Sequence, residues 1–365
     1  MKKVALSLLA LTFVGASAFG DDAAAAPKPI GTFTAWNEGI VQLYKQSGGS
    51  DATVGWGPAW NNVTGIDQEW SFGYDGKDYG FSGTLEFGQD NFGNSGVDAA
   101  TGAGVSAPSL SWFGTYYKFN KYLELQVGKL RVGDYRPAGT LIEGNWATRI
   151  ASSEFGPLLQ VTLVDNLSLG VFANINQGAL VKNYPYFLNY GAAYTVPNLG
   201  KATATYRNVD RILNGGVSVS VLAPATITAA FQTQADNSSS IISKKFTASI
   251  GGDFVENFTT NLDVGYSAAN GSDDALGFEV QAQYAIGAYA LGARVGYENV
   301  AGGGGTLLWG NTDGIDGSGG FEIYPYGTVN FDNSSSVTIG FFYTSGGIKG
   351  SESLVEIPIT YVWSF

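Results

Sequence analysis

The feature that most constrains this chain is an alternation of apolar and polar side chains that recurs, segment after segment, as far as its last residue. In 276–284 every second residue, from Leu276 to Tyr284, is apolar or aromatic, and the residues between them include Glu279 and two glutamines. Successive side chains of a β-strand point to opposite faces, so each such segment has one apolar face and one polar face. The chain is therefore predicted to be all-β. The alternation is equally clean in three other segments, 258–266, 288–298 and 355–365.

The connections between these segments alternate between short and long. Short joins such as 75–77, 165–166 and 286–287 contain the Gly, Asn and Asp residues that tight turns require. The longer joins are expected to include 133–156 and 208–214. A closed up-and-down sheet with one constrained rim and one free rim explains this pattern. We count eighteen strands, or sixteen or fourteen if weak pairs are merged.

The strand lengths suit a membrane. A tilted strand of ~9–11 residues crosses a hydrocarbon core, and in lipid every backbone N–H and C=O must be paired, so the sheet has to close. The pattern predicts a closed antiparallel transmembrane β-barrel with an apolar outer face, short turns at one rim and long loops at the other. The soluble alternative is a secreted β-sandwich or β-helix. It would need two or more sandwiches and a linker, and no change of composition marks one.

Composition excludes most other classes of protein. Charged residues make up 14% of the chain, against about 25% in soluble proteins, which is too few to cover an ordinary water-facing surface. The net charge of −12 and the 19 Lys and Arg residues argue against a nucleic-acid partner. The absence of Cys and His excludes disulfides, zinc sites of the usual kind and a Ser-His-Asp triad. We therefore expect no enzyme, no cofactor and no metal site.

The N-terminus differs from the rest of the chain. Two lysines at positions 2 and 3 precede an apolar run, 4–14, and the sequence Ala16-Ser17-Ala18 is a cleavage signal. This pattern predicts an exported protein whose signal peptide is cleaved after Ala18 or after Gly20. The expected organisation is a signal peptide over 1–20, a disordered lead over 21–31 and the barrel over 32–365.

The last strand carries a resemblance to a known family. Its aromatic residues Tyr361, Trp363 and Phe365 share one face and end in a C-terminal Phe, and the chain in this respect resembles Gram-negative outer-membrane porins. The resemblance implies that these residues are the signal read by the barrel-assembly machinery. It also implies that the chain lies in outer-membrane lipid, with periplasmic turns and extracellular loops, and it leaves open a homotrimer. It identifies no subfamily.

A second, more local resemblance lies in the third long loop, 133–156. In general porins this loop folds into the lumen and carries a Glu-Phe-Gly step, which is present here at Glu154. The loop holds two of the six arginines, and a third, Arg131, lies just before it. An exposed, self-neutralising outer loop is the alternative interpretation. The candidate constriction residues are Arg131, Asp134, Arg136, Glu143, Arg149 and Glu154.

A barrel of sixteen or eighteen strands leaves a water-filled lumen, through which small hydrophilic solutes and ions can diffuse passively. Pore radius and wall charge then set selectivity. Acidic residues outnumber basic ones on the polar faces, which predicts a mild preference for cations. The expected wall residues are Glu69, Glu86, Glu124, Gln126, Gln160, Arg207, Asp263, Glu279, Gln281, Arg294 and Glu356.

A second function class remains open at this point. In a surface adhesin or antigen, the barrel is only an anchor and long loops such as 46–65, 89–108 and 299–318 carry the function. Conductance after reconstitution separates the two, because a plugged barrel conducts little.

Overall fold

The structure is a computed structural model, and it describes residues 31–47, 53–56, 66–87, 109–136, 149–175, 187–222, 224–236, 240–270, 274–301, 318–332, 334–345 and 353–364. The signal peptide, almost all of the N-terminal lead, Glu143 and Phe365 lie outside the described residues. Their expected roles stay predictions. Among the described residues, no helix is long and apolar enough to cross a membrane.

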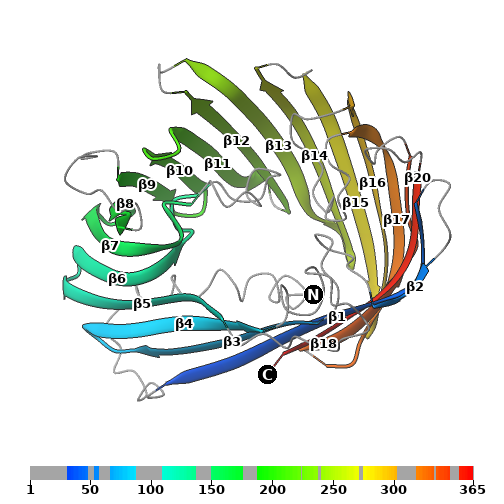
Figure 1. The fold of residues 1–365 in the computed structure, drawn as a ribbon, viewed down its shortest axis with the longest axis horizontal. Coiled ribbons are helices and arrows are strands. Elements are labelled where there is room, and N and C mark those ends of the chain that lie inside the picture. Colours follow the sequence, from blue (N-terminus) through cyan, green and yellow to red (C-terminus); the bar gives the residue numbers. More distant parts are fainter. Residues whose placement is uncertain are drawn as a thin grey trace, which may run out of the picture.

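The described part of the chain forms one antiparallel sheet of twenty strands (Figure 1). The strands are β1 (Thr32–Ser47), β2 (Thr53–Trp56), β3 (Ile66–Asp75), β4 (Tyr79–Phe87), β5 (Ser109–Asn120), β6 (Leu123–Val132), β7 (Ala151–Val164), β8 (Leu167–Ala173), β9 (Leu188–Val196), β10 (Gly200–Arg207), β11 (Ile212–Leu222), β12 (Ala225–Ala235), β13 (Ile241–Val255), β14 (Phe258–Ala269), β15 (Ala275–Ile286), β16 (Tyr289–Ala301), β17 (Ser318–Asn330), β18 (Ser335–Gly340), β19 (Phe342–Ser345) and β20 (Ser353–Ser364).

The sheet closes on itself because β1 pairs with β3 on one side and with the last strand, β20, on the other. The four-residue strand β2 pairs with β1 alone among the described strands. Strands β18 and β19 both lie between β17 and β20 and together fill one position. Setting β2 aside and counting β18 and β19 once, the described strands fill eighteen positions around the barrel, as predicted. Closure pairs each of these eighteen described positions on both sides, as a sheet in lipid requires.

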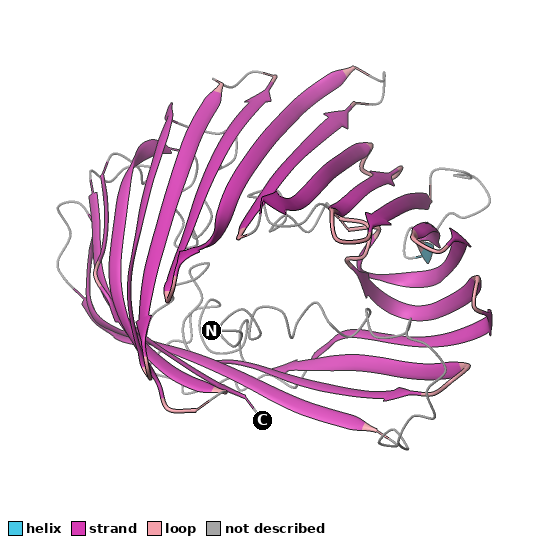
Figure 2. Cartoon of the chain, turned by 180° about the vertical axis from the view of Figure 1, so that it is seen from behind, coloured by secondary structure: helices cyan, strands magenta, loops and turns pink. Residues whose placement is uncertain are grey.

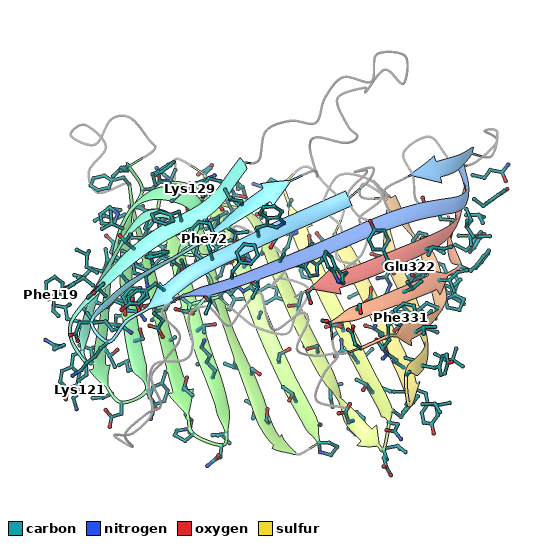
Figure 3. All side chains as sticks on the ribbon, turned by 90° about the horizontal axis from the view of Figure 1, so that it is seen from below. Phe72, Phe119, Lys121, Lys129, Glu322 and Phe331 are labelled. Atoms are coloured by element: carbon teal, nitrogen blue, oxygen red, sulfur yellow. The ribbon has the colours of Figure 1, made fainter. Side chains whose placement is uncertain are left out.

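The connections predicted to be short lie at one rim of the barrel, together with the start of β1 and the end of β20. Asn198, Asn257 and Gly287 lie in these turns with φ of 60°, 64° and 60°, a conformation that Asn and Gly adopt more readily than other residues. The predicted turn residues therefore form turns. Figure 3 shows the barrel from the side, with Lys121 of the β5–β6 turn toward this rim and Lys129 nearer the other.

The two faces of the sheet differ as the alternation predicts. On β15, Leu276, Phe278 and Val280 are exposed on the outside, whereas Gly277 and Glu279 between them are buried. The same contrast recurs around the barrel, where the exposed outward residues are large and apolar. Such a continuous apolar outer surface is stable against lipid and not against water. The buried polar residues of the central strands include Thr203, Thr205, Asn214, Thr228, Gln232, Thr247, Ser249, Asp263, Ser267, Glu279 and Arg294.

The expected boundaries of the third long loop are wrong at its C-terminal end. Strand β7 begins at Ala151, so Glu154 and Phe155 belong to the barrel wall and not to a loop over 133–156. The register shifts between Leu130 and Arg131 of the neighbouring strand, and Ser153 has a φ of 63°. This bulge interrupts the two-residue period, which is why the alternation does not reveal the start of the strand.

Two further expectations need correction. The long loop expected over 208–214 is a tight turn, because Arg207 pairs directly with Ile212. Arg211 in this turn has a φ of 52°, which lets four residues reverse the chain. The alternation along 337–343 predicts one strand, and the structure has two, β18 and β19, with Phe341 between them; both keep one register with β17 and β20.

Candidate functional site

The inner wall on the side of β4, β6, β7 and β10 carries ion pairs. The Nη1 atom of Arg131, at the end of β6, lies 3.8 Å from the Oε1 atom of Glu86 on β4. Arg207 at the end of β10 lies 2.7 Å from Glu154 of β7 and 2.6 Å from Asp210 in the following turn. The bulge at Ser153 directs Glu154 inward, where the backbone N–H of Ser152 also donates to its carboxylate at 2.6 Å. Cations and carboxylates are thus held together near the long-loop rim.

The chain that leaves β6 turns inward and packs against this wall. In opposite views, Figures 1 and 2 show the loop after β6 inside the ring of strands, next to β8–β10. Tyr135 is fully buried there, and its hydroxyl lies 3.0 Å from the Ser168 Oγ of β8. The side-chain amide of Gln160 donates to the same oxygen at 3.1 Å. Lys201 Nζ of β10 donates to the carbonyl oxygen of Asp134 at 2.8 Å.

Burial affects the titration of two groups in this turn. It raises the pKa of the Asp134 carboxyl, and the Lys201 ammonium nearby partly opposes that effect. Burial also raises the pKa of the Tyr135 phenol, so its hydroxyl stays protonated and can donate a hydrogen bond at neutral pH.

The chain that returns to β7 is attached to the same wall. The side-chain amide of Asn189, on β9, donates to the carbonyl oxygen of Ile150 at 3.0 Å. Arg207 Nη1 donates to the carbonyl oxygen of Arg149 at 3.3 Å. Asn189 and Ile150 are fully buried. Both described ends of the segment between β6 and β7 therefore lie on the inner face of β8–β10.

The wall formed by β14–β17 carries a second charged cluster. Arg294 of β16 lies 3.2 Å from Glu322 of β17 and 3.8 Å from Glu279 of β15. Its guanidinium also lies 5.6 Å from the centre of the Tyr324 ring. Asp263 of β14 is the direct register partner of Glu279. Three acidic side chains and one guanidinium lie in this part of the wall, so acidic groups outnumber basic ones there.

A band of neutral polar groups lies beside this cluster. Tyr326 accepts a hydrogen bond from the Gln281 amide at 3.2 Å and donates one to the Gln283 side chain at 3.0 Å. Its ring lies near that of Tyr324, with ring centres 5.3 Å apart. Phenol and amide groups of this kind can hydrogen-bond to water and suit a wet wall.

The residues predicted to line the lumen fall into two groups, the wall residues and the constriction candidates. All the expected wall residues lie on inward-facing positions of their strands, for example Glu124, which accepts a hydrogen bond from Gln126 at 2.8 Å. Of the constriction candidates, Asp134, Arg136 and Arg149 lie in the segment between β6 and β7, whereas Arg131 and Glu154 lie in strands and Glu143 is outside the described residues. The roles of the wall residues and of the constriction candidates in selectivity stay predictions.

Sequence reasoning missed Tyr135, Asn189, Lys201 and Tyr324. A signal for the first two was present, because Leu158 of β7 and Phe172 of β8 are apolar residues on the inner face and each is fully buried. Apolar residues on the wet face of a strand indicate that something covers them, and here the cover is the chain around Tyr135 and Ile150.

Comparison with known proteins identifies the fold. No family model matches the chain, and no curated protein matches its sequence. Among solved structures, OpdL of Pseudomonas aeruginosa matches with a TM-score of 0.56 at 10% identity, over 92% of this chain and 98% of that one. OccAB4 of Acinetobacter baumannii matches with a TM-score of 0.56 at 12% identity, over the same shares. A loop-deletion mutant of OmpT, an outer membrane protein of Vibrio cholerae, matches with a TM-score of 0.50 at 10% identity, over 92% and 100%.

At these identities the likeness shows the fold. It is the closed barrel of outer-membrane porins, as the resemblance of the terminal strand implied, and it spans nearly the whole of each protein compared.

Proposed function

We propose that this chain is an outer-membrane porin through which small hydrophilic solutes and ions diffuse passively. The observation that supports this most directly is the contrast between faces in a closed barrel of eighteen strand positions. The outer face is apolar and suits lipid, and the inner face carries the ion pairs and amides described above. A barrel of this size has room for a water-filled lumen.

The segment between β6 and β7 is proposed to narrow that lumen. Its two described ends lie against the inner wall and are held there by Lys201, Asn189 and Arg207. Charged groups of both signs, including Arg131 and Glu154, lie next to the segment.

We further propose a mild preference for cations. The inward acidic side chains outnumber the inward basic ones, and around Arg294 the excess is largest, because Glu279 and Glu322 flank a single guanidinium and Asp263 lies beside Glu279. Fixed negative charge on a pore wall attracts cations and repels anions.

Planar-bilayer recording tests both proposals. The purified protein should open stepwise conductances, and under a salt gradient the reversal potential should have the sign of cation flow. A barrel that serves only as an anchor for surface loops would give no such steps. Anion preference that persists after Arg136 and Arg149 are neutralised would refute the selectivity proposal.

A further inference from the structure

We infer that Tyr135 is a positioning residue that sets the width of the lumen, because its ring fills a socket that the wall provides through two glycines. This inference rests on the proposed porin function. It concerns the attachment of the segment between β6 and β7 and not the charges that the segment carries.

The socket is a space left by missing side chains. Gly170 of β8 and Gly191 of β9 are direct register partners. A Cβ atom built on Gly170 would lie 2.6 Å from Cε2 of Tyr135, and one built on Gly191 would lie 2.5 Å from its Cγ. Neither glycine has the left-handed φ that would itself call for glycine. The wall therefore needs glycine at both positions to make room for the ring.

A cluster of buried apolar side chains adjoins the socket. Tyr135 and Ile150, from the two ends of the segment, form one buried cluster with Leu158 of β7 and Phe172 of β8. Leu158 and Phe172 would face water if the segment moved away, and their exposure would oppose such a movement. The wall thus matches this segment in two respects, the space left by the two glycines and the apolar side chains beside it.

Hydrogen bonds define the orientation of the seated ring. The Tyr135 hydroxyl meets Ser168 Oγ at 3.0 Å, and the preceding carbonyl, of Asp134, accepts from Lys201 at 2.8 Å. The ring fills the socket, and the two polar contacts fix its orientation. Loss of the ring should release the segment, whereas loss of the hydroxyl alone should leave it seated.

The experiment combines substitutions on the two sides of the contact, measured by single-channel conductance and by the uptake of uncharged sugars of increasing size into proteoliposomes. Tyr135→Ala and Gly170→Ala are each expected to raise the conductance and to abolish the wild-type size limit. Tyr135→Phe is expected to retain both. The double variant should equal Tyr135→Ala, because the atoms that a methyl group at 170 would meet are the Cε2, Cζ and hydroxyl of Tyr135, and Tyr135→Ala removes all three.

A matched control separates this effect from general strain in the sheet. Gly215 on β11 faces outward beneath the Phe231 ring, and a Cβ there would lie 2.5 Å from its Cε1. Gly215→Ala therefore crowds an aromatic ring equally but on the lipid side, and it should leave conductance and size limit unchanged. Heat-resistant migration in detergent gels reports that each barrel is folded.

The outcomes are distinct. A wild-type protein that does not conduct overturns the porin proposal itself. A conducting wild type whose folded Tyr135→Ala variant keeps the same conductance and size limit overturns the role of Tyr135 alone. Additive effects of the two single substitutions would also overturn it, because they would show that the two residues do not act through one contact. Tyr135 lies outside the strands, so its variant keeps the test available should Gly170→Ala not fold.

Discussion

Placing an arginine at two adjacent positions of β15 tests which face of the barrel meets lipid. Val280 is the sixth of the twelve residues of this strand; its side chain points outward and is 41% exposed. Gln281 points inward and reaches the lumen. The two positions share a depth, a strand and a sheet neighbourhood, so the substitutions differ chiefly in the face to which the charge is added.

The expected cost follows from depth. A rise of ~3.3 Å per residue and a strand tilt of ~40° place Val280 about 15 Å from either rim along the barrel axis, near the middle of an apolar band about 25 Å high. An arginine on the lipid face at that depth costs about 2–4 kcal/mol, and about 3 kcal/mol corresponds to about a hundredfold change in the folding equilibrium. Gln281→Arg should change stability by about 0.5 kcal/mol or less, as at a water-facing site, because Glu279 and Arg294 flank it with opposite charges.

The assay is reversible unfolding by guanidinium from phospholipid vesicles, followed through the fluorescence of the eight tryptophans. Val280→Arg should lower the unfolding midpoint, and Gln281→Arg should leave it nearly unchanged while shifting the reversal potential toward anions. Equal losses at both positions, or a larger loss at Gln281, would show that the outer face is not in lipid or that the inner face is dry. Either result would refute the assignment of the two faces.

Two further predictions concern single contacts. The Arg207–Glu154 pair is largely buried, with 9% and 15% of the side chains exposed, so a double-mutant cycle with Arg207→Gln and Glu154→Gln should give a coupling of about 2 kcal/mol. Asp210 is 36% exposed, and its coupling to Arg207 should stay below about 1 kcal/mol; the reverse order would contradict the burial argument. In the β17–β18 turn, hydrogen bonds from Ser335 and Ser334 lower the pKa of Asp332 to about 2. A carboxyl whose folded pKa lies below its unfolded value stabilises above the unfolded pKa of about 3.9 and loses that effect as pH falls through the folded one. The stability difference between wild type and Asp332→Asn should therefore be constant near neutral pH and shrink from about pH 4 toward pH 2, and a difference that persists at pH 2 would show that the charge is not involved.

The strands and turns were predictable because their signals are local. Alternation along 276–284 indicates which side chains of β15 share a face, and Asn257 and Gly287 indicate where the chain reverses, without any knowledge of the other strands. The inward position of Glu279 and Arg294 follows from the same parity. Alternation shows which face of the sheet a side chain lies on, but not which side chains of other strands lie near it. The proximity of Arg294 to Glu322 was therefore not predicted.

The misses occur where the period is broken. The positive φ at Ser153 inserts a residue into β7 and hides the start of that strand. No such shift occurs at Phe341, where β18 and β19 keep one register with β20. A strand covered on both faces reads as a continuous apolar run and not as an alternation, and the neighbours Leu158 and Leu159 are such a run. They are ambiguous until the structure shows one buried and the other exposed.

That ambiguity bears on how the lumen is built. Leu158 and Phe172 would each expose apolar surface to a water-filled lumen, which is unfavourable unless another part of the chain covers them. The Tyr135 ring can do so only because Gly170 and Gly191 leave room for it, and β7 can bring Glu154 to Arg207 beside the same cluster only because Ser153 forms a bulge. Residues from three consecutive strands and from both ends of one connection therefore require one another. It follows that the seated segment is part of the folded barrel and should unfold with it: amides near Tyr135 should be as protected from hydrogen exchange as those of β8, and markedly faster exchange there would mean that the segment leaves its socket in the folded protein.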